Sequence, residues 1–149
     1  MKARYLLDAN VLVYTLDSRE LEKRERAKEV LRRTALMGSG VLPVQALSEF
    51  SNVCLRKLRP TLAPEEVRLE VERLTLAFPV LPLTPLVVSE VLRGVQEHSF
   101  SYYDAQVWAA ARLGQVAGIL SEDFNTGATI EGVQFVDPSD SAFDVMILG

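Results

Sequence analysis

The apolar residues of this chain alternate between short runs and longer stretches with helical spacing. The short runs are typical of strands buried on both faces, and they predict strands over residues 5–7, 41–42, 80–81, 117–120 and 133–136. The longer stretches predict helices over residues 9–16, 20–37, 45–58, 64–77, 85–96 and 101–113. Glycine and proline mark several boundaries: Gly38-Ser39-Gly40 ends one helix, and Pro64 begins another.

Short apolar strands that alternate with helices predict an α/β fold. We expect three layers, α/β/α, with a central, mainly parallel sheet of four to five short strands. The 149 residues are enough for one domain with a substantial core, so we expect a single domain over 1–149 with a tail over 139–149. The tail ends in the apolar residues Val145 to Leu148.

Composition narrows the class of protein. Hydrophobic residues make up 48% of the chain and charged residues 24%, which is typical of a globular domain and not of a disordered one. The net charge of -4 is not the strongly basic charge typical of a nucleic-acid-binding domain, although bound cations would offset part of the negative charge.

No apolar run has the length of a membrane span, and we expect a cytoplasmic protein. The single cysteine, Cys54, is expected to be a buried hydrophobe, and the lone His98 to be a solvated residue near a helix end.

Four acids stand among apolar residues, where a carboxylate is hard to explain by packing. Asp8 closes the first strand, Glu49 lies on the helix after the second, Asp104 begins the helix before the fourth, and Asp123 follows that strand. Ligands in open α/β sheets bind outside the carboxyl ends of the strands, so all four can face the same edge of the sheet.

Each acid also has an ordinary structural interpretation. Asp8 suits the N-cap of the helix after it, and Glu49 could be a solvated helix residue. Ser101 and Asp104 fit a capping box, and Asp123 could be a simple loop acid. Glu122 competes with Asp123, but alternation after the strand places Asp123 with Ser121 and turns Glu122 away.

A cluster of carboxylates is stable only with protons or cations. Oxygen ligands suit hard ions, so we expect Mg²⁺ or Mn²⁺ and phosphate chemistry. Asp8, Asp104 and Asp123 would bind metal directly or through water. Glu49 would be a further ligand, or a base that orients the attacking water. Asn10 and Ser121 would hold the carboxylates in place.

The four acidic segments resemble motifs of one family. Leu7-Asp8-Ala9-Asn10, Leu47-Ser48-Glu49-Phe50, Tyr103-Asp104-Ala105 and Ser121-Glu122-Asp123-Phe124 are similar to the ordered motifs of PIN-domain nucleases, specifically VapC-type toxins of toxin–antitoxin pairs. The resemblance covers about residues 4 to 138. It departs at Asp137-Pro138, where the family usually has Asn-Pro, and in the apolar tail.

The resemblance implies a metal-dependent endoribonuclease that hydrolyses RNA phosphodiester bonds. It also implies a homodimer and a cognate antitoxin that inhibits the enzyme by covering the acidic cleft. The basic residues Arg56, Lys57, Arg59, Arg93 and Arg112 could steer RNA or simply be solvated, and Tyr102 and Tyr103 could stack bases or pack in a core.

Two other classes of function stay open at this point. One is an aspartate-dependent phosphatase or phosphotransferase with Asp8 as nucleophile, although such enzymes commonly have a second Asp where this chain has Asn10. The other is a catalytically silent PIN-fold binding module, against which the presence of the four acids argues.

Overall fold

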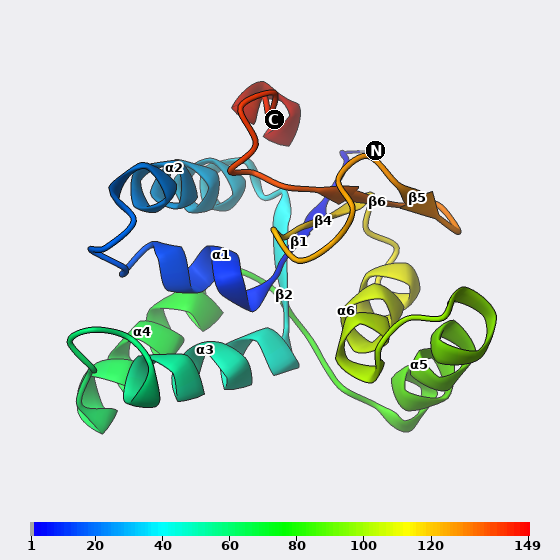
Figure 1. Ribbon diagram of the computed structural model, residues 1–149, viewed down its shortest axis with the longest axis horizontal. Helices are drawn as coiled ribbons and strands as arrows, with labels where there is room; N and C mark the ends of the chain where they lie inside the picture. The colour runs from blue at the N-terminus through cyan, green and yellow to red at the C-terminus, as the bar shows by residue number, and fades with distance from the viewer. Residues whose placement is uncertain (1) are drawn as a thin grey trace.

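The computed structural model describes residues 2–149, which form a central sheet between two layers of helices (Figure 1). The strands are β1 (Tyr5–Leu7), β2 (Gly40–Pro43), β3 (Val80–Leu81), β4 (Gly118–Leu120), β5 (Thr129–Ile130) and β6 (Val133–Val136). The helices are α1 (Ala9–Tyr14), α2 (Leu21–Met37), α3 (Val44–Arg56), α4 (Pro64–Ala77), α5 (Pro85–His98) and α6 (Tyr102–Leu113), followed by the 3₁₀ helix η1 (Val145–Leu148). The predicted three-layer α/β architecture is confirmed.

The sheet has six strands in the order β3-β2-β1-β4-β6-β5, and β5 alone runs antiparallel to its neighbour. The expected number of four to five strands was therefore too low. The missing strand is β5, a two-residue strand that is only partly covered and carries no readable apolar run. It forms a hairpin with β6 through Glu131 and Gly132, which both have positive φ, as a tight hairpin turn requires.

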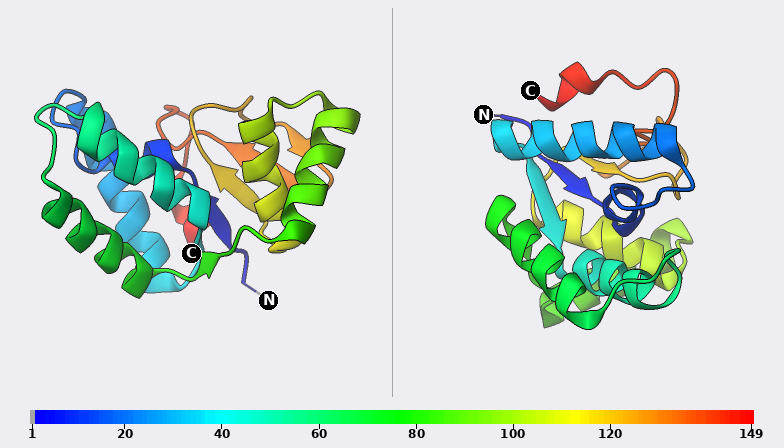
Figure 2. Two further views of the ribbon diagram at one scale, coloured as in Figure 1. Left: turned by 90° about the horizontal axis from the view of Figure 1, so that it is seen from below. Right: turned by 90° about the vertical axis from the view of Figure 1, so that its left-hand side faces the viewer.

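Alternate residues of the central strands point to opposite faces of the sheet and build two separate cores. Leu7, Leu42 and Leu120 pack with α1, α2, α3 and α4 on one face. Leu6, Val41 and Ile119 pack with α5 and α6 on the other. Figure 2 shows the α3–α4 pair and the α5–α6 pair on opposite sides of the sheet. Because every residue of β1, β2 and β4 is buried, these strands read as continuous apolar runs.

Cys54 and the C-terminal tail both pack against the body of the fold. Cys54 is fully buried in the α3 core, and burial raises the pKa of its thiol to about 11, so it behaves as a small hydrophobe. The tail is not a free end, because Leu148 is buried against α2 and its carbonyl accepts a 2.6 Å hydrogen bond from Ser39 Oγ. Among residues 2–149, no helix combines the length and the apolar character needed to cross a membrane.

Candidate active site

Asp8 is held rigidly at the carboxyl end of β1. Its Oδ1 accepts a 2.8 Å hydrogen bond from the backbone N–H of Ala9, and its Oδ2 accepts one of 2.8 Å from Ser121 Oγ. The residue is only 6% exposed. It is the N-cap of α1, so the capping interpretation and the functional one both apply to the same carboxylate. Burial raises the pKa of Asp8, and the nearby charges of Asp123 and Asp104 raise it further, against the opposing effect of the two hydrogen bonds.

Glu49 and Asp104 come from helices in different layers of the fold. Glu49 lies in the first half of α3, on a side of that helix that is open to solvent. The surrounding groups still desolvate its carboxyl in part. That desolvation raises the pKa of Glu49, and the charges of Asp8, Asp123 and Asp104 add to the shift. Asp104 is half-buried in the first turn of α6, where its backbone N–H donates to Ser101 Oγ at 3.3 Å. That bond is one of the two that a capping box contains.

Asp123 is placed by a short turn after β4. Asn10 Nδ2 donates to Asp123 Oδ2 at 3.0 Å, and the backbone N–H of Asp123 donates to Ser121 Oγ at 3.1 Å. Asn10 Nδ2 also donates to Ser121 Oγ at 2.9 Å. The hydroxyl of Ser121 therefore donates to Asp8 and accepts from the backbone of Asp123, so that it connects the carboxylate of Asp8 to the turn that carries Asp123. Asn10 and Ser121 thus contact the two carboxylates that they were expected to hold in place.

Glu122 turns away from its neighbour Asp123, as expected. Its carboxylate accepts a 2.5 Å hydrogen bond from the phenol of Tyr14 and a 3.0 Å hydrogen bond from Lys23 Nζ. Its backbone N–H donates to Asn10 Oδ1 at 3.4 Å. Sequence reasoning did not identify Tyr14 and Lys23 as supports of the site. Their spacing relative to Glu122 carries no local signal, because the contacts join residues from α1 and α2 to a turn late in the chain.

All four predicted acids line one open cleft of about 740 Å³. The remaining lining residues are Ser48, Asn52, Val53, Lys57, Tyr103 and Val107. One wall is α3 and the other is α6, and the floor is the carboxyl edge of β1 and β4. The structure thus brings Asp8, Glu49, Asp104 and Asp123 together, while it leaves Glu122 outside.

The donor set of the cleft suits a hard divalent cation. Its acidic groups are all carboxylates. Burial first, and the charges of the neighbouring acids second, raise the pKa values of Asp8 and Glu49, and a bound cation would favour their charged forms. The carboxylates are spread along the cleft. Among residues 2–149, one group of three acidic or histidine side chains has its ligand atoms within 4.8 Å of one another, and it consists of Glu97, His98 and Glu131, outside the cleft. Spacing of this kind suits Mg²⁺, which keeps several of its waters and contacts some ligands through them.

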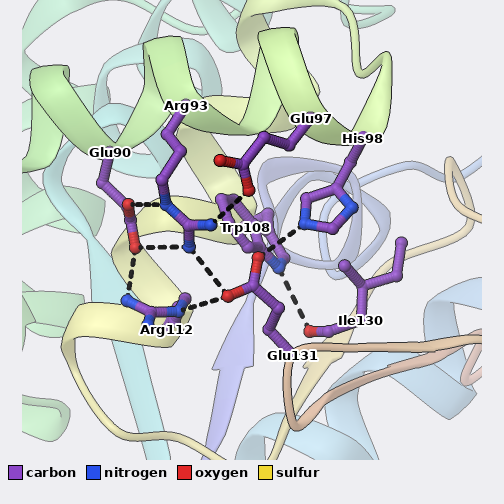
Figure 3. Close-up of polar contacts among 8 residues, drawn as sticks. All are labelled: Glu90, Arg93, Glu97, His98, Trp108, Arg112, Ile130 and Glu131. Carbon is purple, nitrogen blue, oxygen red and sulfur yellow. Dashed lines mark hydrogen bonds and ion pairs between the residues drawn. The ribbon is translucent and has the colours of Figure 1, made fainter.

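The cluster at Glu97, His98 and Glu131 is already neutralised by arginine (Figure 3). Arg93 donates to Glu90 at 2.6 Å, to Glu97 at 2.7 Å and to Glu131 at 2.8 Å. Arg112 also contacts Glu90 and Glu131. Because the guanidinium of Arg93 already supplies positive charge between Glu97 and Glu131, the cluster is an ion-pair network and not a second candidate metal site.

This network also changes the interpretation of three residues. Arg93 and Arg112 were named as groups that could steer RNA, but their guanidinium groups are engaged by glutamates. His98 was expected to be solvated, yet its Nε2 lies 2.5 Å from Glu131 Oε2 and its ring packs edge-on against Trp108 at 5.3 Å. Of the five basic residues considered from the sequence, Lys57 is the one that lines the acidic cleft.

Comparisons with known proteins agree with this fold. A family model described as PIN domain matches residues 5–126. A search of curated protein sequences gave no match. Among solved structures, a toxin–antitoxin complex from Klebsiella pneumoniae aligns with a TM-score of 0.61 and 19% identity, over 90% of this chain and 97% of that one.

Two further structures are similar at the level of the fold. The sarcin-ricin loop cleaving toxin VapC20 from Mycobacterium tuberculosis aligns with a TM-score of 0.57 and 16% identity, over 80% of this chain and 91% of that one. VapBC2 from Rickettsia felis, solved with a DNA fragment of its promoter, aligns with a TM-score of 0.57 and 9% identity, over 89% of this chain and 98% of that one.

Proposed function

We propose that this chain, which belongs to the PIN-domain family, is a metal-dependent endoribonuclease and the toxin of a toxin–antitoxin pair. One observation carries the proposal: Asp8, Glu49, Asp104 and Asp123, which are far apart in the sequence, line a single cleft at the carboxyl edge of the sheet. Burial and the neighbouring acids both disfavour the charged form of Asp8, and a bound cation would offset both effects.

Asp8, Asp104 and Asp123 would hold Mg²⁺ or Mn²⁺ directly or through water, with Glu49 as a further ligand. When bound, such an ion lowers the pKa of water and withdraws negative charge from the phosphate and the leaving oxygen. Alternatively, Glu49 would act as the base that orients the attacking water, since it lies on the solvent-open side of α3, whereas Asp8 is buried and already accepts two hydrogen bonds. Ser121 and Asn10 keep the carboxylates of Asp8 and Asp123 in fixed orientations through the hydrogen bonds described above.

The choice of RNA as substrate, and of an antitoxin as partner, is supported by the neighbours in fold. One of them is a toxin–antitoxin complex and another is a toxin that cleaves the sarcin-ricin loop. We propose the same kinds of substrate and partner here, together with a homodimer. Exposed leucines on two helices, Leu69 and Leu76 of α4 and Leu86 and Leu92 of α5, supply apolar surface that such partners could bury.

Cleavage of RNA by the purified chain tests the proposal. Wild type should cut single-stranded RNA in Mg²⁺ or Mn²⁺ and stop when a chelator is added. Asp104→Ala should abolish cleavage while the circular dichroism spectrum and melting curve stay those of a folded protein. Glu72→Gln, an exposed acid of α4 outside the cleft, is the matched control and should cut like wild type. Retained cleavage by Asp104→Ala, in a preparation free of contaminating nuclease, would overturn the assignment.

Calorimetric titration with Mn²⁺ separates the enzyme from a silent binding module of the same fold. A saturable site in wild type that is lost in Asp8→Asn supports the metal site. The absence of any saturable site in the folded wild-type protein would count against it.

A further inference from the structure

The two walls of the acidic cleft differ in the groups that they offer to a ligand. Along α3, Ser48 and Asn52 line the cleft one helical turn apart. The C-cap residue Lys57 follows Val53 by four residues and Glu49 by eight, and these three residues also line the cleft. The α6 wall offers Tyr103 and Val107 beside Asp104. A ligand in the cleft therefore meets polar groups and an ammonium on one side, and an aromatic and apolar surface on the other.

Lys57 is the basic residue that lines this cleft, and its ammonium group makes no ion pair among the described residues. Within residues 2–149 no carboxylate lies within ion-pair distance of its Nζ, whereas Lys23 is held by Glu122 and Arg93 and Arg112 by the network in Figure 3. Lys57 follows Glu49 by eight residues, which corresponds to about 12 Å along a helix. A phosphate at Lys57 and another at the acids would thus belong to the same strand, a short distance apart.

Tyr103 presents an aromatic ring to the same cleft. The residue is 70% exposed, and its ring contacts Tyr102 edge-on, with the ring centres 5.4 Å apart and the planes at 88°. A single edge-on contact covers at most one face of the Tyr103 ring, and the exposure of the residue leaves ring surface for a ligand. The bases of a duplex are stacked on each other, so a base can use such a face only where the RNA is unpaired.

We propose that the cleft binds single-stranded RNA across its width, with a backbone phosphate on Lys57 and an unpaired base on Tyr103. The phosphate to be hydrolysed lies between them, at the four acids. The inference rests on the proposed nuclease function but concerns binding, so it is tested on binding. It explains how a cleft dominated by carboxylates can attract a polyanion: the α3 wall contributes the ammonium, and the α6 wall contributes stacking that does not depend on charge.

The test measures fluorescence anisotropy of a labelled oligouridine of about ten nucleotides in Mg²⁺, with Asp104→Asn as the background so that the RNA stays intact. Lys57→Gln should weaken binding and lower the slope of log Kd against log salt by about 0.7, the value for one phosphate contact of a single strand. Lys57→Arg should retain most of the slope. Lys28→Gln removes a lysine of α2 outside the cleft and is the matched control.

Tyr103→Leu should weaken binding by about tenfold at every salt concentration, while Tyr103→Phe should bind like the background protein, because the ring and not the hydroxyl is needed. An RNA hairpin stem of equal length should compete poorly. Unchanged salt slope in Lys57→Gln, unchanged affinity in Tyr103→Leu, or equal competition by the stem would overturn the inference.

The outcome for the proposed function is read separately, from cleavage by the wild-type protein. If wild type cuts RNA and the two substitutions leave binding unchanged, the strand path is wrong and the function stands. If the substitutions weaken binding as expected but wild type does not cut RNA, the nuclease function is wrong. If the background protein does not bind the oligouridine at all, the strand path is overturned whatever the result of the cleavage assay.

Discussion

The phenol of Tyr14 in α1 donates a 2.5 Å hydrogen bond to the carboxylate of Glu122, beside the acid that faces the cleft. Lys23 of α2 binds the same carboxylate at 3.0 Å, and its ammonium also lies 4.9 Å from the centre of the Tyr14 ring. Side chains of α1 and α2 thus hold Glu122, which lies outside the cleft. The turn that carries Asp123 is therefore fixed by the contacts of Tyr14 and Lys23 with Glu122 and by the hydrogen bond from Asn10 to Asp123. The orientation of Asp123, a proposed metal ligand, therefore depends on groups that do not enter the cleft.

Tyr14→Phe should weaken metal binding more than it weakens the fold. The substitution removes one of the two side-chain hydrogen bonds to Glu122. Because Glu122 is the neighbour of Asp123 and not itself a proposed ligand, the loss of metal affinity should be smaller than the about tenfold typical of a group bonded directly to a ligand. Titration calorimetry with Mn²⁺ measures the affinity, and melting in a chelator measures the fold. Tyr5→Phe removes a phenol hydroxyl at the amino end of β1 and should leave Mn²⁺ affinity unchanged. Equal Mn²⁺ affinity in Tyr14→Phe and wild type would show that the hydrogen bond from Tyr14 to Glu122 does not support the metal site.

Asp8→Asn should raise the melting temperature of the metal-free protein at pH 7. The raised pKa of Asp8 means that its charged form is disfavoured in the fold, and asparagine removes that charge while it can still cap α1. A gain of about 1 kcal/mol would appear as roughly 2–4 °C. Differential scanning fluorimetry in a chelator checks the shift.

Addition of Mg²⁺ or Mn²⁺ should then reverse the order of the two proteins. Metal that binds only the folded state stabilises wild type by mass action, whereas Asp8→Asn lacks a ligand and should show no rise. The same thermal scans, repeated over a series of metal concentrations, give the result. Equal upward shifts in both proteins would show that the ion binds elsewhere.

The ion-pair network of Figure 3 should make stability depend on pH through Glu131. Hydrogen bonds from Arg93 and His98 lower the pKa of Glu131 from 4.5 to about 2. A lowered carboxyl pKa gives stabilisation that is fully present above the unfolded value and is lost as the pH falls through the folded value. Melting temperatures of wild type should therefore fall more steeply than those of Glu131→Gln between about pH 5 and about pH 3. Parallel curves for the two proteins over this range would contradict the assignment.

Gly94→Ala should destabilise the contact between α5 and α6. A Cβ at residue 94 would lie 2.8 Å from the ring of Trp108, which is fully buried and has no room to withdraw. Overpacking of this kind costs about 1–3 kcal/mol, and the better helix propensity of alanine returns only about 1 kcal/mol. Urea denaturation should show the net loss. Ser89→Ala, at an exposed position of the same helix, should be neutral or slightly stabilising.

The sequence predicted those parts of the fold and of the candidate site that have a local signal. Buried strands such as β1 and β4 are continuous apolar runs, so periodicity identified them and the edge of the sheet where Asp8 and Asp123 lie. Alternation beyond β4 was enough to separate Asp123 from Glu122. The proline and two glutamates at the start of α4 gave its bounds without error.

The sequence could not predict features that depend on contacts between distant segments. The strand β5 is defined by its hairpin partner and not by its own two residues. The support of Glu122 by Lys23 joins α2 to a turn after β4, and the exclusion of Arg93 and Arg112 from the cleft depends on glutamates of α5 and of the β5–β6 turn. Such pairings become visible only when the chain is folded.

The central place of β1 in the sheet has a consequence for the timing of synthesis. Its neighbours are β2, which follows it closely, and β4, which leaves the ribosome only after α6. Until β4 pairs with β1, Ser121 cannot reach Asp8 and the turn with Asp123 has no fixed place. A growing chain therefore carries three of the acids before it can assemble the cleft, and the four carboxylates come together only after translation of this region is complete.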